Sequence, residues 1–253
     1  MVEATRTIIG DMNHPADFCG VFSLRELRDQ DSHGRDLEEI LAGRRLTRVR
    51  RGWFATLGAD PVVVGAIRAG GVVSCLTALK MYGIWVPEHP LRVHVRACAS
   101  TMRSAPPRKF CTAVGGATPE GRAIDDLSTA LLHAVKCVDD EGAVAVFDSV
   151  LNQKLMTEWD LASLFARSKR VQRLLPKCDG RAQSGIETFA RVRLRAKHVK
   201  LDVQVFLPCV AGWVDILIGR RLVLELDGKQ TPPRSSSRRT ESATLPLLKA
   251  DTR

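Results

Sequence analysis

The sequence predicts an α+β fold in which helical and strand-forming segments occupy separate parts of the 253-residue chain. Two arms rich in Val, Ile and Leu, residues 213–218 and 222–227, flank a glycine-containing break, which is typical of a β-hairpin. Residues 122–176 repeat apolar side chains at helical spacing, and residues 23–55 contain short helical stretches followed by an arginine-rich ribbon. We therefore divide the chain into an N-terminal region at 1–100, a mainly helical linker module at 101–180, a core at 181–230 and a tail at 231–253.

Composition and charge limit the classes of protein to which the chain can belong. A hydrophobic content of 45% is enough to form real cores, but the longest apolar runs, such as residues 62–67, are far too short to span a bilayer. The N-terminus lacks the pattern of a secretory signal, so we expect a soluble cytoplasmic protein with no membrane partner. Lysine and arginine total 38 against 28 acidic residues, and the formal net charge of +10 favours a polyanionic partner such as DNA.

The seven cysteines predict neither a disulfide framework nor a zinc site, because they are odd in number, widely scattered and never arranged as CxxC. We expect reduced thiols in the core. Residues 92–96 alternate like a half-exposed strand, with His94 on its polar face. The sequence shows no group of other ligand or catalytic residues with which His94 could act. A structural role is therefore predicted for His94 and for the other five histidines.

The N-terminal region has the order helix, helix, basic ribbon, which is that of a winged helix. Ser23 and Glu26 form a capping-box pattern, a second helix is expected at residues 35–42, and residues 60–83 have a helical pattern farther on. In a winged helix the second of these helices enters a major groove, while the ribbon contacts phosphates or a minor groove. The alternative is a small structural subdomain with a solvated basic hairpin. The candidate DNA-binding residues are Arg35, Arg44, Arg45, Arg48, Arg50 and Arg51.

The hairpin near the C-terminus gathers acidic side chains on one face. A loop of three or five residues places its apolar side chains together and leaves Asp215, Glu225 and Asp227 on the opposite face. Asp215 then sits across from Glu225, and like charges opposed across a ladder destabilise the pair unless a group such as a divalent cation neutralises them. The alternative is that these acids are the solvated face of an antiparallel sheet.

The order Glu187, then Val214-Asp215, then Glu225-Leu226-Asp227-Gly228 resembles the PD-(D/E)xK nuclease core. The resemblance covers about residues 184–230 and is to the subgroup similar to very-short-patch repair endonucleases, found in many actinobacterial proteins of unknown function. It implies a restriction-endonuclease-like α/β core. Residues 1–100 resemble the winged-helix domain of AbiEi-type antitoxins.

The nuclease resemblance implies Asp215 and Glu225 as ligands of Mg²⁺ or Mn²⁺, with Glu187 assisting. Asp227 occupies the position at which the family usually has a lysine, and Lys229 is the nearest substitute. Glu187 also fits a capping box with Ser184, an explanation that needs no metal. The five candidate catalytic residues are therefore Glu187, Asp215, Glu225, Asp227 and Lys229.

Two functions remain open on the sequence. The first is a metal-dependent DNA endonuclease of the repair or phage-defence type. The second is an antitoxin-like transcriptional regulator with a degenerate nuclease domain, for which a toxin partner or a homodimer is expected. Residues 231–253 are rich in Pro, Ser, Thr and Arg without helical or strand periodicity, so we expect a disordered basic tail there. We also expect a truncation or frameshift near residue 230, which would leave the core incomplete and the nuclease weak or inactive.

Overall fold

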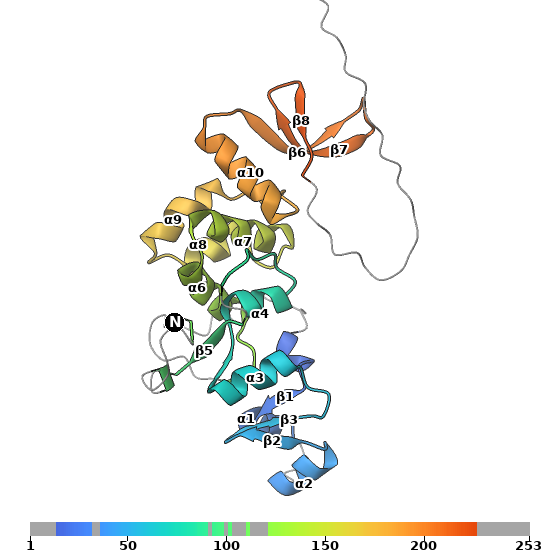
Figure 1. The fold of residues 1–253 in the computed structure, drawn as a ribbon, viewed down its shortest axis with the longest axis vertical. Coiled ribbons are helices and arrows are strands. Elements are labelled where there is room, and N and C mark those ends of the chain that lie inside the picture. Colours follow the sequence, from blue (N-terminus) through green and yellow to red (C-terminus); the bar gives the residue numbers. More distant parts are fainter. Residues whose placement is uncertain are drawn as a thin grey trace, which may run out of the picture.

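The computed structural model describes residues 14–31, 36–90, 93–98, 101–102, 110–111 and 121–226. Helices and strands both contribute, so the predicted α+β class is confirmed. The molecule is elongated, with a three-stranded sheet at each end and most of the helices between them (Figure 1). None of the helices in these ranges combines the length and the apolar character needed to cross a bilayer.

The N-terminal sheet combines three short antiparallel strands with two helices. Its strand order is β1-β3-β2, and α1 and α2 lie between β1 and β2 in the sequence. The predicted capping box of α1 is confirmed: the Glu26 N–H donates to Ser23 Oγ, and the Ser23 N–H donates to Glu26 Oε2 at 2.8 Å. The elements are the 3-10 helix η2 (Pro15–Asp17), β1 (Val21–Ser23), α1 (Leu24–Asp29), α2 (Leu37–Gly43), β2 (Thr47–Arg50) and β3 (Trp53–Ala55).

Both faces of this sheet are covered by other parts of the protein. Successive residues of a strand point to opposite faces, so neighbouring side chains enter different cores. Phe54 packs with Leu27 of α1, Ile40 of α2 and Leu46 in a small separate core. Its neighbour Trp53 joins the main core of the molecule. The sheet therefore holds α1 and α2 on one side and the rest of the protein on the other.

The predicted helix over residues 60–83 is interrupted by a strand. The structure has α3 (Pro61–Ala69), β4 (Gly71–Val73) and α4 (Cys75–Met81), and β4 pairs antiparallel with β5 (Val95–Ala97). Gly70 ends α3 with a left-handed φ of 101°, a conformation that glycine adopts without strain. A Cβ on Gly71 would lie 2.2 Å from the Arg96 carbonyl oxygen, so the close strand pairing requires glycine there.

The central part is helical, as predicted for residues 122–176. It contains α6 (Leu127–Cys137), α7 (Asp140–Asn152), α8 (Glu158–Leu164), α9 (Lys169–Leu174) and the 3-10 helix η3 (Leu175–Lys177). Thr157 and Asp160 form the capping box of α8. One hydrophobic cluster extends from the N-terminal part to α9, so the segments on both sides of residue 100 share a core.

The C-terminal part consists of one helix and a three-stranded antiparallel meander. It contains α10 (Gly185–Ala196), β6 (Leu201–Leu207), β7 (Gly212–Ile218) and β8 (Leu222–Leu224) in the sheet order β6-β7-β8. Ile218 pairs with Leu222 across a three-residue loop, which confirms the predicted hairpin register. Helix α10 lies between this sheet and the central helices (Figure 1).

Two close contacts hold α10 on the rest of the protein. A Cβ on Gly185 would lie 2.3 Å from the ring of Trp85, so only glycine allows the start of α10 to pack this closely. Farther along the helix, the fully buried Arg191 donates to Asp148 Oδ2 of α7 at 2.5 Å and to the Lys177 carbonyl at 2.6 Å. The Asp148 carboxylate also accepts from the Thr188 hydroxyl at 2.7 Å. The position of the C-terminal sheet therefore depends on a buried ion pair.

Candidate carboxylate site

Glu187 lies in the first turn of α10 and is buried, with 5% of its surface exposed. Its backbone N–H donates to Ser184 Oγ, which is half of the predicted capping box. The other half differs, because Glu187 Oε2 accepts from the N–H of Gln183, one residue before the cap, at 3.0 Å. The same oxygen accepts from Gln204 Nε2 at 3.0 Å, so the carboxylate is directed toward strand β6.

Asp215 approaches the same amide group from strand β7. Its Oδ1 accepts from Gln204 Nε2 at 3.2 Å, and its Oδ2 accepts from the Leu226 N–H at 2.9 Å. One NH₂ group therefore bridges the two carboxylates. We call Glu187, Gln204 and Asp215 the carboxylate site.

Gln204 is the residue of this site that the sequence does not predict. It lies between the pairs Val203↔Ile216 and Val205↔Val214, at the position across from Asp215. Its φ of +50° is left-handed, which costs a residue with a side chain about 1–2 kcal/mol. Its Oε1 accepts from Gln183 Nε2 at 3.2 Å, so both ends of the amide are hydrogen bonded. The one signal in the sequence is a polar side chain between two valines, Val203 and Val205.

The remaining predicted residues of this site are placed only in part. Glu225 follows the last residue of β8 and is exposed; continuing the register Ile216↔Leu224 by one position places it across from Asp215, as expected. Asp227 and Lys229 lie outside the described residues. The metal set of Asp215 and Glu225 therefore remains a prediction.

The chemistry available to this site follows from its donors and acceptors. An amide NH₂ between two carboxylates offers two N–H groups where a cation would offer positive charge. Mg²⁺ is bound through one or two carboxylates plus waters and substrate phosphates, so it would have to displace the Gln204 amide or share the Asp215 oxygens with it. In the described ranges, the group of three or more ligand-type side chains that could share an ion is Cys75, His94, Cys111 and Cys137, and no carboxylate belongs to it.

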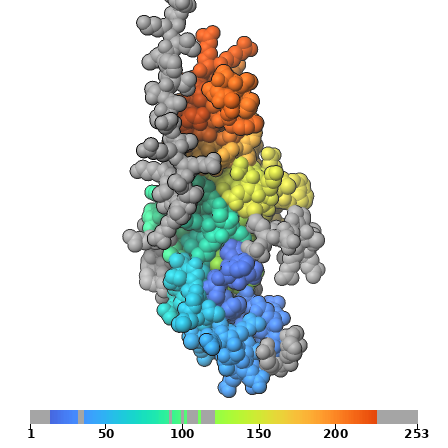
Figure 2. Space-filling model, turned by 90° about the vertical axis from the view of Figure 1, so that its right-hand side faces the viewer, coloured from blue at the N-terminus to red at the C-terminus, as the bar shows by residue number. Residues whose placement is uncertain are grey.

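The basic ribbon, residues 44–55, lies at the opposite end of the molecule. Figure 2 shows the N-terminal elements and the C-terminal sheet at the two extremes of the elongated shape. Arg45, Arg48 and Arg51 are exposed, whereas the Arg44 guanidinium donates to Gln30 Oε1 at 2.8 Å. Arg50 is half-buried and continues β2 beside Trp53. Arg35 lies outside the described residues.

The exposed surface of α2 is acidic rather than basic. Asp36 caps the helix by accepting from the Glu39 N–H at 2.8 Å, and Glu38 and Glu39 are exposed in the first turn. Carboxylates at a helix N-terminus stabilise the helix through its dipole. Such carboxylates repel phosphates, and the exposed positive charge of this region lies on the ribbon rather than on α2.

No protein-family model, no curated protein and no solved structure matches this chain.

The spacing of the cysteines in the sequence does not reveal that three of them meet a histidine in the fold. Cys75, His94, Cys111 and Cys137 come together in the fold, although they are far apart in the sequence. His94 is 2% exposed and so does not lie on a polar strand face. Sequence spacing fails here because each of the four residues comes from a different segment.

Proposed function

We propose that the chain is a DNA-binding protein whose C-terminal part is a metal-dependent endonuclease-like unit that is weakly active or inactive. The observation that carries the proposal is the convergence of Glu187 and Asp215 on one amide group. A helix followed by an antiparallel meander, with one acid on the helix and one on the second strand, fits the arrangement that the resemblance to PD-(D/E)xK nucleases implies. Metal ions in such a site polarise the scissile phosphate and activate the attacking water.

The N-terminal part supports the DNA-binding half of the proposal. Its element order β1, α1, α2, β2, β3 and its sheet order β1-β3-β2 are those expected of a winged helix. The exposed side chains of Arg45, Arg48 and Arg51 are available to phosphates. We assign the ribbon to backbone contacts, which fix position without reading sequence.

Cleavage is tested with purified full-length protein and supercoiled plasmid in Mg²⁺ or Mn²⁺. We expect slow nicking that Asp215→Asn abolishes, because the ion loses its central carboxylate. The matched control is Asp202→Asn, which removes an exposed carboxylate from the same sheet outside the carboxylate site. Equal nicking by the wild type and by Asp215→Asn would show that the activity does not arise at this site.

A second function, an antitoxin-like regulator, is favoured by one specific observation. Gln204 and the Leu226 N–H satisfy Asp215 and Glu187 without a metal ion, as in a site that has become purely structural. This function predicts DNA binding that is independent of divalent ions and no nicking. A footprint obtained in EDTA, together with intact plasmid in Mn²⁺, would favour the regulator over the nuclease.

The basic ribbon gives a separate prediction for either function. Replacing Arg45, Arg48 and Arg51 together by Ala should weaken binding to all DNA sequences. It should also reduce the slope of log K against log salt by about one unit for each phosphate that the variant no longer neutralises. The control replaces three exposed basic residues of the central part, Arg167 in the turn before α9 and Lys169 and Arg173 in α9. An unchanged slope for the ribbon variant, or an equal reduction for the control, would remove the ribbon from the interface.

A further inference from the structure

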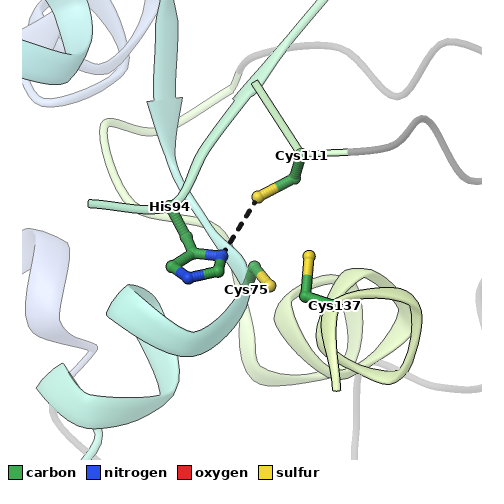
Figure 3. A group of neighbouring side chains, drawn as sticks. All are labelled: Cys75, His94, Cys111 and Cys137. Carbon is green, nitrogen blue, oxygen red and sulfur yellow. Dashed lines mark hydrogen bonds between the residues drawn. The ribbon is translucent and has the colours of Figure 1, made fainter. Parts of the chain in front are cut away.

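Four ligand-type side chains from four separate segments converge between the N-terminal part and the central helices. Cys75 begins α4, His94 directly precedes β5, and Cys137 ends α6. Cys111 joins them because its backbone N–H donates to the Val95 carbonyl of β5 at 2.9 Å. We call these four residues the Cys/His cluster; Figure 3 shows their side chains directed toward a common centre.

The distances within the Cys/His cluster suit a small ion. All four ligand atoms lie within 4.8 Å of one another, and His94 Nδ1 is 3.4 Å from Cys111 Sγ. Tetrahedral zinc with bonds of about 2.3 Å to sulfur and about 2.0 Å to nitrogen separates its ligand atoms by roughly 3.5–3.8 Å. Small movements of the side chains would therefore bring all four atoms to bonding distance.

The backbone around the Cys/His cluster is held in place by further contacts. The His94 N–H donates to Thr77 Oγ1 of α4 at 2.7 Å. The neighbouring Arg96 forms a buried two-point ion pair with Asp125, at 2.6 and 2.5 Å, which ties β5 to the segment before α6. Cys75 has a left-handed φ of +54°, a strained conformation for a residue with a Cβ and one that is frequent at functional sites. The site is therefore preorganised by its surroundings.

The imidazole of His94 is oriented for ligation through one nitrogen. Nδ1 faces the cysteine sulfurs, whereas Nε2 points away from them (Figure 3). Nε2 is buried, and within the described residues it has no hydrogen-bond partner. A tautomer with the proton on Nε2 leaves the Nδ1 lone pair directed at the sulfurs, as a metal ligand requires.

A packing role alone does not account for these residue types. Cys75 and Cys111 are almost fully buried, and Ala or Val would fill the same space without bringing thiols beside an imidazole. Three thiols beside an imidazole form the donor set of a sulfur-rich metal site, and thiolate is the form of cysteine that binds metal.

We propose that Cys75, His94, Cys111 and Cys137 bind one Zn²⁺ ion in a tetrahedral Cys₃His site. Sulfur-rich tetrahedral ligand sets select zinc over Mg²⁺ or Mn²⁺, and four protein ligands leave no open position for a substrate. The ion is therefore structural. It joins α4, β5 and α6, and thereby fixes the N-terminal part to the central helices. Cys137 is half-exposed and provides a route by which the ion enters.

The first test measures metal in the wild-type protein. After reconstitution with Zn²⁺ and gel filtration, we expect one zinc per chain by mass spectrometry of the metal. Replacing zinc by Co²⁺ should give the visible absorption of a tetrahedral thiolate site. Chelation should lower Tm by about 10 °C, because the binding energy of a structural zinc contributes to folding. No bound metal, or a disulfide between two cysteines of the cluster in peptide mapping without reduction, would overturn the proposal.

The second test uses matched variants. Cys75→Ser and Cys137→Ser should each lose zinc and the cobalt spectrum. Cys19→Ser, at a buried thiol outside the cluster that donates to the Ala16 carbonyl, should keep one zinc. If the Cys75 variant does not fold, the number of reactive thiols in the wild-type protein tests the proposal instead. Three thiols should become reactive only as zinc is released. Full zinc retention by Cys137→Ser, or equal reactivity of all thiols with zinc present, would contradict the proposal.

Discussion

Asp148→Ala should lower the free energy of unfolding by about 3–5 kcal/mol, because it leaves the Arg191 guanidinium buried without its partner. Arg191 has no exposed surface, and its contacts with Asp148 and the Lys177 carbonyl hold α10 on α7. Its Nε atom already lacks a hydrogen-bond partner within the described residues. Urea denaturation at pH 7 followed by circular dichroism measures the decrease.

The same two helices provide the control for this prediction. Arg193 of α10 pairs with Glu141 of α7 at 2.8 Å, but this pair lies at the surface. Glu141→Ala should therefore change stability little, because water and salt screen exposed ion pairs. The double variant Asp148→Leu, Arg191→Met should be more stable than Asp148→Ala, because it removes both charges. A small effect of Asp148→Ala would show that water reaches Arg191.

Gln204→Glu should destabilise the protein by about 3 kcal/mol, because it removes two N–H···carboxylate bonds, each worth about 1.5–3 kcal/mol. It also places a third negative charge between Glu187 and Asp215. Mn²⁺ or Mg²⁺ should then restore much of the stability, since an ion that binds only the folded state stabilises it. Thermal melts of the variant with and without the metal measure both effects.

Gln153→Glu is the matched control for this substitution. Gln153 donates through Nε2 to the Gly83 carbonyl and the Ser149 hydroxyl, and neither partner is charged. This variant should be destabilised less and should show no response to the metal. Rescue of both variants by the ion would indicate nonspecific binding, and rescue of neither would exclude a cation site at Gln204.

Local chemistry explains the parts of the fold that the sequence predicts. The capping box at Ser23 involves residues three positions apart, so the pattern appears in any short stretch of sequence that contains both residues. The hairpin register follows from alternation on both sides of a short loop. Strand β4 escapes prediction because it occupies three residues, between two stretches that each have a helical pattern.

Long-range convergence explains what the sequence does not predict. Gln204 acquires its role from α10 and β7 together, and its left-handed backbone has no signature in the residue type. Arg191 resembles its basic neighbours on α10, and only the tertiary packing buries it. The Cys/His cluster draws on four segments, so no short spacing motif exists to be found. In each case the missing information is which distant segments pack together.

The arrangement of the molecule along one axis has a consequence for how it would act on DNA. The basic ribbon and the C-terminal sheet lie at opposite extremes, with most of the helices between them. If the basic ribbon binds a duplex as proposed, the C-terminal sheet would lie away from the bound sequence rather than on it. Cleavage by such a molecule would fall at a fixed offset from the footprint. Lengthening the central part would move the cut without altering the site that is recognised.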